Sequence, residues 1–142
     1  MMITAYLLAR RFIGVKEVPG DQSHPLIAWW LLLCRFGLGA KDEIPWCSAF
    51  VNGIAWSLDL PWTQSAAARS WLQCGVPVQL DDAICGFDIV VLERGLDGVS
   101  GHVGFYVRHD LQKVWLLGGN QSNAVTEQAF DRVKVLGVRR LA

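Results

Sequence analysis

The apolar residues of this chain recur at helical spacing in its first half and alternate in its second half. Thr4 can cap a helix that runs to Phe12, and Gly14 follows as a stop signal. Further helices are expected after Pro25, after Pro45 and over 65–74. The order of helices first and strands second excludes a regular β-α-β alternation.

Runs typical of β-strands occupy the second half of the chain. In the run 102–107, every second residue is apolar, so that Val103 and Phe105 share one face and His102 lies on the other. The predicted fold class is therefore α+β, with N-terminal helices packed on a C-terminal antiparallel sheet. The strands are expected at 88–92, 102–107, 113–117 and 133–139.

Length and composition limit the possible functions. The 142 residues are enough for one domain, 1–142, and 52% of them are hydrophobic. Thirteen basic residues balance thirteen acidic ones, so no face is expected to attract nucleic-acid phosphates. The longest apolar run, 26–34, is much shorter than the roughly 20 residues of a membrane-spanning helix. The N-terminus does not resemble a secretory signal, which predicts synthesis in the cytoplasm without one.

The four cysteines are not spaced as metal ligands are, and we expect free thiols and neither a metal nor another cofactor. Cys47 is the most informative of them, because it is expected in the first turn of the helix after Pro45. There the helix dipole lowers the pKa of a thiol, and free N–H groups can stabilise an oxyanion. Cys47 is thus a candidate nucleophile, and the alternative is a buried structural cysteine.

His102 is a candidate general base. It lies between two glycines, Gly101 and Gly104, at the start of a predicted strand, where another group can approach the imidazole closely. The hairpin that follows returns the segment 116–123 towards His102. Asn120 can accept a hydrogen bond from the imidazole there and fix its tautomer, and Gln121 and Asn123 are rivals for this role.

Several blocks of the sequence, taken in order, resemble the papain-like NlpC/P60 and CHAP peptidoglycan hydrolases, most closely their small phage- and prophage-encoded branch. The blocks are PWCSAFVN, ARSW, GFDIVVL, GHVGFYV and GGNQ. The resemblance implies a papain-like fold with Cys47 as nucleophile, His102 as general base and Asn120 as third residue. It also implies cleavage of an amide bond in the peptide part of the cell wall, by an endopeptidase or an N-acetylmuramoyl-L-alanine amidase.

Residues around the predicted triad are candidates for the remaining roles. The backbone N–H of Cys47 or Ser48 is expected to hold the oxyanion. Trp46 and Trp71 are expected to line the substrate groove, with Gln121 as a further contact. Asp42 and Glu43 are candidates for binding the amine of a diaminopimelate-containing peptide, and they are too few for a calcium site.

The predicted partner is bacterial peptidoglycan, reached by a monomeric protein after release or injection. A phage endolysin released through a holin, a phage-tail component and an injected antibacterial effector with an immunity protein all fit this prediction. A non-catalytic papain-like module that binds cell-wall peptide or a protein is the rival from another class. A lipid-directed acyltransferase is disfavoured, because those relatives commonly place His before Cys. A metal hydrolase is disfavoured by the spacing of Cys and His.

Overall fold

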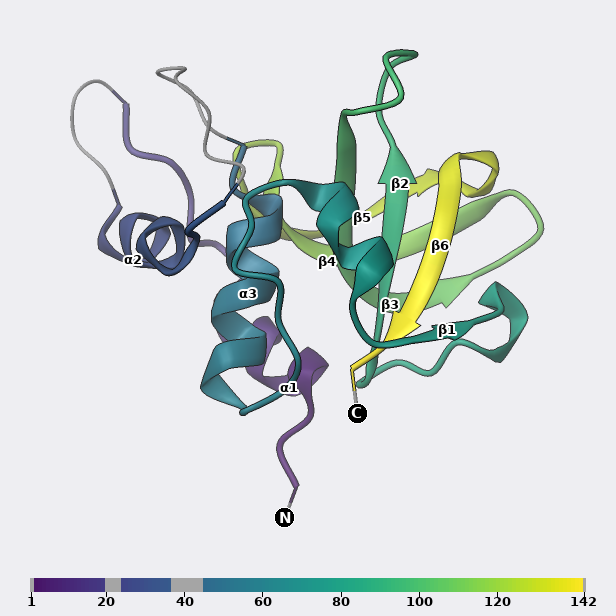
Figure 1. Cartoon of the computed structure of the whole chain (residues 1–142), viewed down its shortest axis with the longest axis horizontal. Coiled ribbons are helices and arrows are strands. Elements are labelled where there is room, and N and C mark those ends of the chain that lie inside the picture. The colour runs from purple at the N-terminus through teal and green to yellow at the C-terminus, as the bar shows by residue number, and fades with distance from the viewer. Residues whose placement is uncertain (1, 20–23, 37–44, 142) are drawn as a thin grey trace.

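The computed structural model describes residues 2–19, 24–36 and 45–141. In this part of the chain, the α-helices lie on one face of a six-stranded antiparallel sheet, which confirms the α+β prediction (Figure 1). The helices are α1 (Ala5–Arg10), α2 (Pro25–Leu33), α3 (Cys47–Ser57) and the 3-10 helices η1 (Ala68–Gln73), η2 (Leu80–Asp82) and η3 (Arg132–Lys134). The strands are β1 (Val76–Val78), β2 (Asp88–Glu93), β3 (Gly101–His109), β4 (Lys113–Gln121), β5 (Ala124–Asp131) and β6 (Val135–Arg140).

The sheet has the strand order β1-β6-β2-β3-β4-β5, and every neighbouring pair is antiparallel. Strands β2 and β3 are therefore central. Their register pairs Leu92 with His102 and Glu93 with Gly101. The candidate base thus lies near one end of the two central strands. No helix in the described residues is long and apolar enough to cross a membrane.

The helix signals of the sequence act as predicted at the first two helices. The Thr4 hydroxyl accepts a hydrogen bond from the N–H of Leu7 at the start of α1, and Pro25 is the first residue of α2. The prediction of a helix over 65–74 is wrong in extent, because only the 3-10 helix η1 forms there. The residues directly before η1 form a tight turn, in which the Ser65 hydroxyl accepts a hydrogen bond from the N–H of Ala67.

Two edge strands, β1 and β5, were not predicted from the sequence. Strand β1 is only three residues long and contains Pro77, which suits an edge position. Strand β5 alternates polar and apolar residues, but Val125 is its only fully buried one, so its apolar signal is weak. Edge strands with one solvated face carry little hydrophobic pattern.

The main core lies between the helices and the sheet and is organised around Trp30 of α2. The Trp30 ring packs edge-on against Phe50 and Phe12, with ring centroids 4.9 and 5.5 Å away, and it stacks on Trp46 at 6.1 Å. Phe50 in turn contacts Phe105 of β3 at 6.1 Å. These aromatic contacts connect α2 to α3 and α3 to the central strands, and so they fix the start of α3 against the sheet.

A second, smaller core covers the opposite face of the sheet. Its buried members come from β2, β3, β4 and β6, and residues from β1, β5 and η2 close it from outside. The central strands are therefore buried on both faces, and a polar side chain on either face is removed from water. The buried members are Val90, Leu92, Tyr106, Val114, Leu116 and Val138.

Gly53 in the middle of α3 allows Trp30 to approach the helix backbone. A Cβ built on Gly53 would overlap the indole ring and come within 2.8 Å of its Nε1 atom. In an exposed helix interior, alanine stabilises by about 1 kcal/mol relative to glycine. Here the overlap with a fully buried indole opposes that gain and exceeds it.

We expect Gly53→Ala to lower the free energy of unfolding by about 1–3 kcal/mol, as overpacking of a core does. Urea unfolding of the wild type and the variant measures the change. Trp30→Phe provides the control background, because the smaller ring leaves space for the new methyl group. If Gly53→Ala costs as much in that background as in the wild type, Trp30 is not the obstacle.

Candidate active site

Cys47 is the first residue of α3, as predicted, and Trp46 occupies the N-cap position. The thiol receives hydrogen bonds from the backbone N–H groups of Val103, Ser48 and Cys47 itself, all of which favour its thiolate form. Val103 directly follows His102 on β3, so the sulfur lies beside the strand that carries the candidate base. The start of the helix and the start of the strand thus meet at one point.

The prediction of a lowered pKa for Cys47 is wrong in this structure. The Cys47 side chain is 1% exposed, and burial raises the pKa of its thiol above the ordinary value. The N–H donors and the charge of Arg94 act in the opposite direction but do not compensate for the loss of hydration. At neutral pH the thiol is therefore protonated.

His102 lies on the face of β3 opposite Val103 and Phe105, as the alternation predicted, and it is 2% exposed. Its imidazole packs against Phe130 of β5, with ring centroids 5.1 Å apart. Burial lowers the pKa of His102 to about 4, because the charged form loses its hydration. The charge of Arg94 acts in the same direction, and the hydrogen bond to Gln121 acts against both.

The hydrogen-bond partner of His102 is Gln121, whose Oε1 lies 2.9 Å from the imidazole Nε2. The Gln121 amide nitrogen donates to the carbonyl oxygens of Thr126 (2.8 Å) and Leu116 (3.2 Å). Because carbonyl oxygens can only accept, the amide must present its oxygen to the imidazole. Nε2 therefore carries the proton, and Nδ1 carries a free lone pair. Nδ1 has no hydrogen-bond partner among the described residues.

Asn120 was predicted to orient His102, and the structure instead places Gln121 there. The β4–β5 register shifts between Gly118 and Gln121, and Asn120 itself has a left-handed backbone, with φ +57°. This irregularity breaks the alternation of strand residues, so that Gln121 reaches the His102 face. Asn123, the other rival, also has a positive φ, +62°, in the turn that follows.

Two adjacent glycines make room for the two halves of the site. A Cβ on Gly118 would overlap the Gln121 side-chain oxygen, whereas a Cβ on Gly119 would lie 2.6 Å from the Trp46 ring. Gly118 therefore accommodates the amide that holds His102. Gly119 accommodates the tryptophan that precedes Cys47. Any side chain at either position would displace one half of the site from the sheet.

The two tryptophans predicted to line a substrate groove are buried in the core. Trp46 stacks on Trp30, and its indole N–H donates to the Glu17 carboxylate at 2.6 Å. The indole N–H of Trp71 donates to the Ser48 hydroxyl at 2.9 Å, and this side chain is fully buried. Both positions are structural in this arrangement, because neither ring offers a surface to a ligand.

Ser48 lies beside the nucleophile and is fully buried. Its hydroxyl donates to the Ser65 carbonyl at 2.6 Å. Its backbone N–H points towards the Cys47 sulfur, where an oxyanion donor is needed. Glu43 and Asp42, the predicted contacts for a substrate amine, lie outside the described residues.

Asp88 has a structural role. It is buried at the start of β2, and its carboxylate accepts hydrogen bonds from the Arg140 guanidinium at 2.8 and 2.9 Å. It also accepts from the N–H of Ile84 at 2.8 Å. The pair joins β2 to β6 at the end of the sheet away from His102.

The sequence analysis missed Arg94, which follows β2. Its charge lowers the pKa of both Cys47 and His102. Arg94 stands next to Glu93, the partner of Gly101 in the β2–β3 pair. The signal available in the sequence was a basic residue two positions after the predicted strand 88–92, which pairs with the strand that carries His102.

Within the described residues, no group of three or more His, Cys, Asp or Glu side chains is placed to hold a metal ion.

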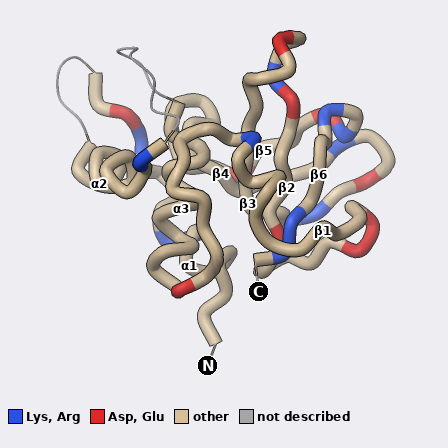
Figure 2. Tube along the Cα trace, in the orientation of Figure 1, with Lys and Arg blue, Asp and Glu red and all other residues tan. Residues whose placement is uncertain are grey.

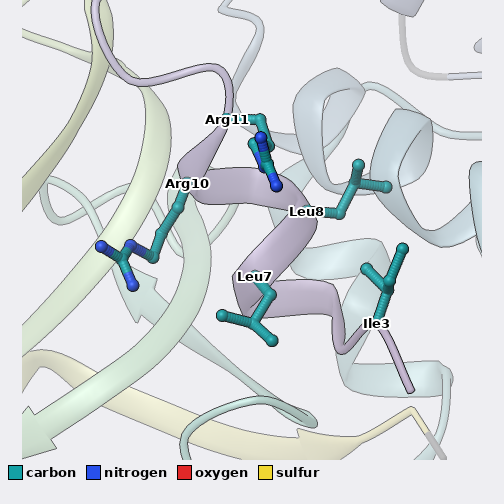
Figure 3. A pocket seen from close by; sticks show the side chains of 5 residues that line it. All are labelled: Ile3, Leu7, Leu8, Arg10 and Arg11. Carbon is teal, nitrogen blue, oxygen red and sulfur yellow. The ribbon is translucent and has the colours of Figure 1, made fainter. Parts of the chain in front are cut away.

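A surface hollow beside α1 lies apart from these residues (Figure 3). Apolar side chains and two arginines line it, without a nucleophile or a base. It therefore offers no chemistry related to Cys47 or His102. The lining residues are Ile3, Leu7, Leu8, Arg10 and Arg11.

Comparisons with known proteins identify the fold. No family model matches the chain, and no curated protein matches it either. Among solved structures, it is similar to NlpC1 from Trichomonas vaginalis, with a TM-score of 0.59 and 20% identity over 96% of this chain and 42% of that one. It is also similar to NlpC2 from the same organism, with a TM-score of 0.58 and 19% identity over 96% and 45% of the two chains. The chain thus has the papain-like NlpC fold and spans less than half the length of either protein.

The burial of His102 predicts a dependence of stability on pH. Since its pKa is about 4 in the folded protein and 6.5 in a free side chain, the unfolded chain binds more protons between these values. The stabilisation is complete above pH 6.5 and is lost as the pH falls towards 4. Between pH 7.5 and 5, we expect His102 alone to cost about 2 kcal/mol of unfolding free energy.

Urea unfolding of the wild type and of His102→Gln at these two pH values isolates this contribution. The variant is expected to lose less stability on acidification than the wild type. His24→Asn is the matched control, because His24 caps α2 at the surface and Asn is also a good N-cap. An equal loss in the wild type and in His102→Gln would show that His102 is not held neutral by the fold.

Proposed function

We propose that this chain is a cysteine hydrolase that cleaves an amide bond in the peptide part of bacterial peptidoglycan. Three features support the proposal: a thiol at a helix N-terminus, an imidazole on the residue before Val103, whose backbone N–H donates to that thiol, and the NlpC fold that contains both. The hydrolase is an endopeptidase or an N-acetylmuramoyl-L-alanine amidase, since both cleave amide bonds.

The observation that carries the proposal is the fixed tautomer of His102. A histidine that only fills a core is expected to have both ring nitrogens paired, whereas Nδ1 of His102 has no partner among the described residues. Here Leu116 and Thr126 hold the Gln121 amide, and Gln121 holds the Nε2 proton. The lone pair is thus kept on Nδ1, as a general base requires.

Burial sets the form of the reaction. With the pKa of Cys47 raised and that of His102 lowered, the resting pair is a neutral thiol and a neutral imidazole. His102 Nδ1 removes the thiol proton as the sulfur attacks the substrate carbonyl, so the thiolate forms during the reaction and not before it. The imidazolium then gives this proton to the leaving amine. Water, deprotonated by the same Nδ1, then attacks the thioester carbonyl, the C–S bond breaks, and the imidazolium returns the proton to the Cys47 sulfur.

The oxyanion of each tetrahedral intermediate needs donors that are already in place. The N–H groups of Cys47 and Ser48 are free at the start of α3 and directed at the sulfur. They are preorganised, because the Ser48 side chain is bonded to Trp71 and Ser65. Donors of this kind typically contribute about 3 kcal/mol to transition-state stabilisation.

The proposal extends to the biological setting in which the protein reaches peptidoglycan. The sequence blocks around Cys47, His102 and Gln121 favour a phage- or prophage-encoded lytic protein, acting as a monomer on the wall after holin-assisted release. An injected antibacterial amidase with an immunity protein uses the same chemistry. Both settings bring the protein to peptidoglycan without a change in the site.

One observation favours a second candidate, a papain-like module that binds cell-wall peptide or a protein without cleaving it. Cys47 is almost completely buried and its thiol is protonated. These are the properties of a structural cysteine. The two candidates differ in whether Cys47 is needed for covalent chemistry, and this difference can be measured directly.

We expect the wild type to release peptide-containing fragments from purified Gram-negative peptidoglycan and Cys47→Ala to release none, because the sulfur forms the acyl intermediate. Mass spectrometry of the soluble products identifies the bond that is cleaved. Cys34→Ala is the matched control, since it removes another buried thiol and is expected to retain activity. Cleavage by Cys47→Ala would disprove the nucleophile, and an intact wall with the wild type would favour the binding module.

Gln121 and Asn120 provide a test of the third residue. Gln121→Ala leaves the Nε2 proton without its acceptor and frees the tautomer, so we expect kcat to fall by about 10²-fold with little change in KM. Asn120→Gly keeps the left-handed backbone and is expected to remain within about twofold of the wild type. Steady-state kinetics on a soluble N-acetylmuramoyl stem peptide, which contains the bonds cleaved by both proposed activities, measures both. The reverse order of effects would restore Asn120 as the orienting residue.

A further inference from the structure

Two arginines meet at the end of the sheet where His102 lies. The Nε of Arg69 on η1 donates to the Ser100 carbonyl at 3.0 Å, and the backbone N–H of Arg94 donates to the same oxygen at 3.2 Å. Ser100 is two residues before His102, and Gly101 between them leaves space for Arg69, whose Cγ would lie 3.2 Å from a Cβ at that position. Both arginines are thus fixed near the start of β3.

Neither side chain is neutralised by an ion pair. Within the described residues, no salt bridge includes Arg69 or Arg94. The loop that joins β2 to β3 carries one acidic residue, Asp97, and Glu93 precedes the loop at the end of β2 (Figure 2). Asp97 accepts hydrogen bonds from the N–H groups of Val99 and Ser100 and from the Ser100 hydroxyl. These bonds lower its pKa, and the charge of Arg69 makes a smaller contribution in the same direction. Arg94 itself is exposed to solvent.

The position of Arg94 relative to the reacting groups is the second observation. Leu92 pairs with His102 and Glu93 pairs with Gly101, so Arg94 is two residues beyond the partner of His102 at the same end of the sheet. In agreement with this position, its positive charge lowers the pKa of both His102 and Cys47. A guanidinium there can bind a carboxylate with two parallel hydrogen bonds.

We propose that Arg69 and Arg94 form a carboxylate-binding subsite next to Cys47 and His102, which selects peptides with a free carboxylate beside the scissile amide. This inference rests on the proposed function. The D-glutamyl and diaminopimelyl residues of a stem peptide carry such carboxylates. Amidation of these groups removes the charge and one acceptor while leaving the peptide backbone unchanged. The protein therefore discriminates between amidated and non-amidated cell walls.

Arg94 also influences the reacting groups directly, and the experiment must separate this effect from substrate binding. A change in the pKa of Cys47 or His102 alters the cleavage of every peptide by the same factor. A lost carboxylate contact alters only the cleavage of the charged peptide. The ratio of kcat/KM for the two peptides therefore reports on the subsite alone.

The test uses an N-acetylmuramoyl tetrapeptide of L-Ala, D-Glu, diaminopimelate and D-Ala, with its D-Glu and diaminopimelate carboxyl groups either free or amidated. We expect the wild type to prefer the free form by roughly tenfold, which corresponds to 1.4 kcal/mol. Arg94→Gln is expected to bring this ratio close to one, and Arg69→Gln to reduce it. Arg108→Gln is the matched control, because Arg108 lies over the Trp115 ring at 3.6 Å and near the other end of β3.

The outcomes separate the two proposals. A preference that disappears in Arg94→Gln and persists in Arg108→Gln supports the subsite. Equal cleavage of both peptides by the wild type overturns the subsite and leaves the hydrolase intact. A preference for the free carboxylates that persists in the Arg69→Gln/Arg94→Gln double variant also overturns the subsite and leaves the hydrolase intact. Because this substrate contains both the N-acetylmuramoyl–L-Ala bond and the peptide bonds of the stem, a wild type that cleaves neither form overturns the proposed function, and the subsite fails with it.

Discussion

The side-chain amide of Gln121 joins three neighbouring strands of the sheet through its two ends. Its oxygen accepts from His102 on β3, and its nitrogen donates to Leu116 on β4 and Thr126 on β5. Since all these groups are removed from water, a misplaced amide would leave buried donors and acceptors unpaired at a cost of about 1–3 kcal/mol each. The same contacts that satisfy the interior of the sheet therefore determine which imidazole nitrogen can act as a base.

Burial on both faces of the sheet explains the electrostatics of the site. It raises the pKa of Cys47, at the start of α3, and lowers that of His102, at the start of β3, so each group is kept neutral for the same physical reason. An ion pair between them would have to repay two desolvation costs. A neutral pair avoids both costs and needs the substrate, the helix N–H groups and a nearby Arg94 to stabilise charge during the reaction.

The sequence was sufficient where a local signal determines the structure. Proline, threonine and the 102–107 alternation correctly predicted the starts of α1 and α2, the first turn of α3 and the face of His102. It was insufficient where tertiary contacts decide. The left-handed Asn120 shifts the register of β4 against β5, which local pattern does not reveal, and so Gln121 replaces Asn120 beside His102. The burial of Trp46 and Trp71 likewise depends on partners, Glu17 and Ser48, that are distant in the sequence.

The hydrogen bonds of Ser48 hold Cys47 and the segment that carries Arg69 in a fixed relative position. Its hydroxyl accepts from the Trp71 indole and donates to the Ser65 carbonyl, and so it ties η1 and the segment before it to the first turn of α3. Asn52, one turn later on α3, also donates to the Ser65 carbonyl at 3.0 Å. Because η1 carries Arg69, these bonds fix the guanidinium relative to Cys47 through buried contacts. The helix that presents the thiol thereby also positions the charge that we propose recognises the substrate.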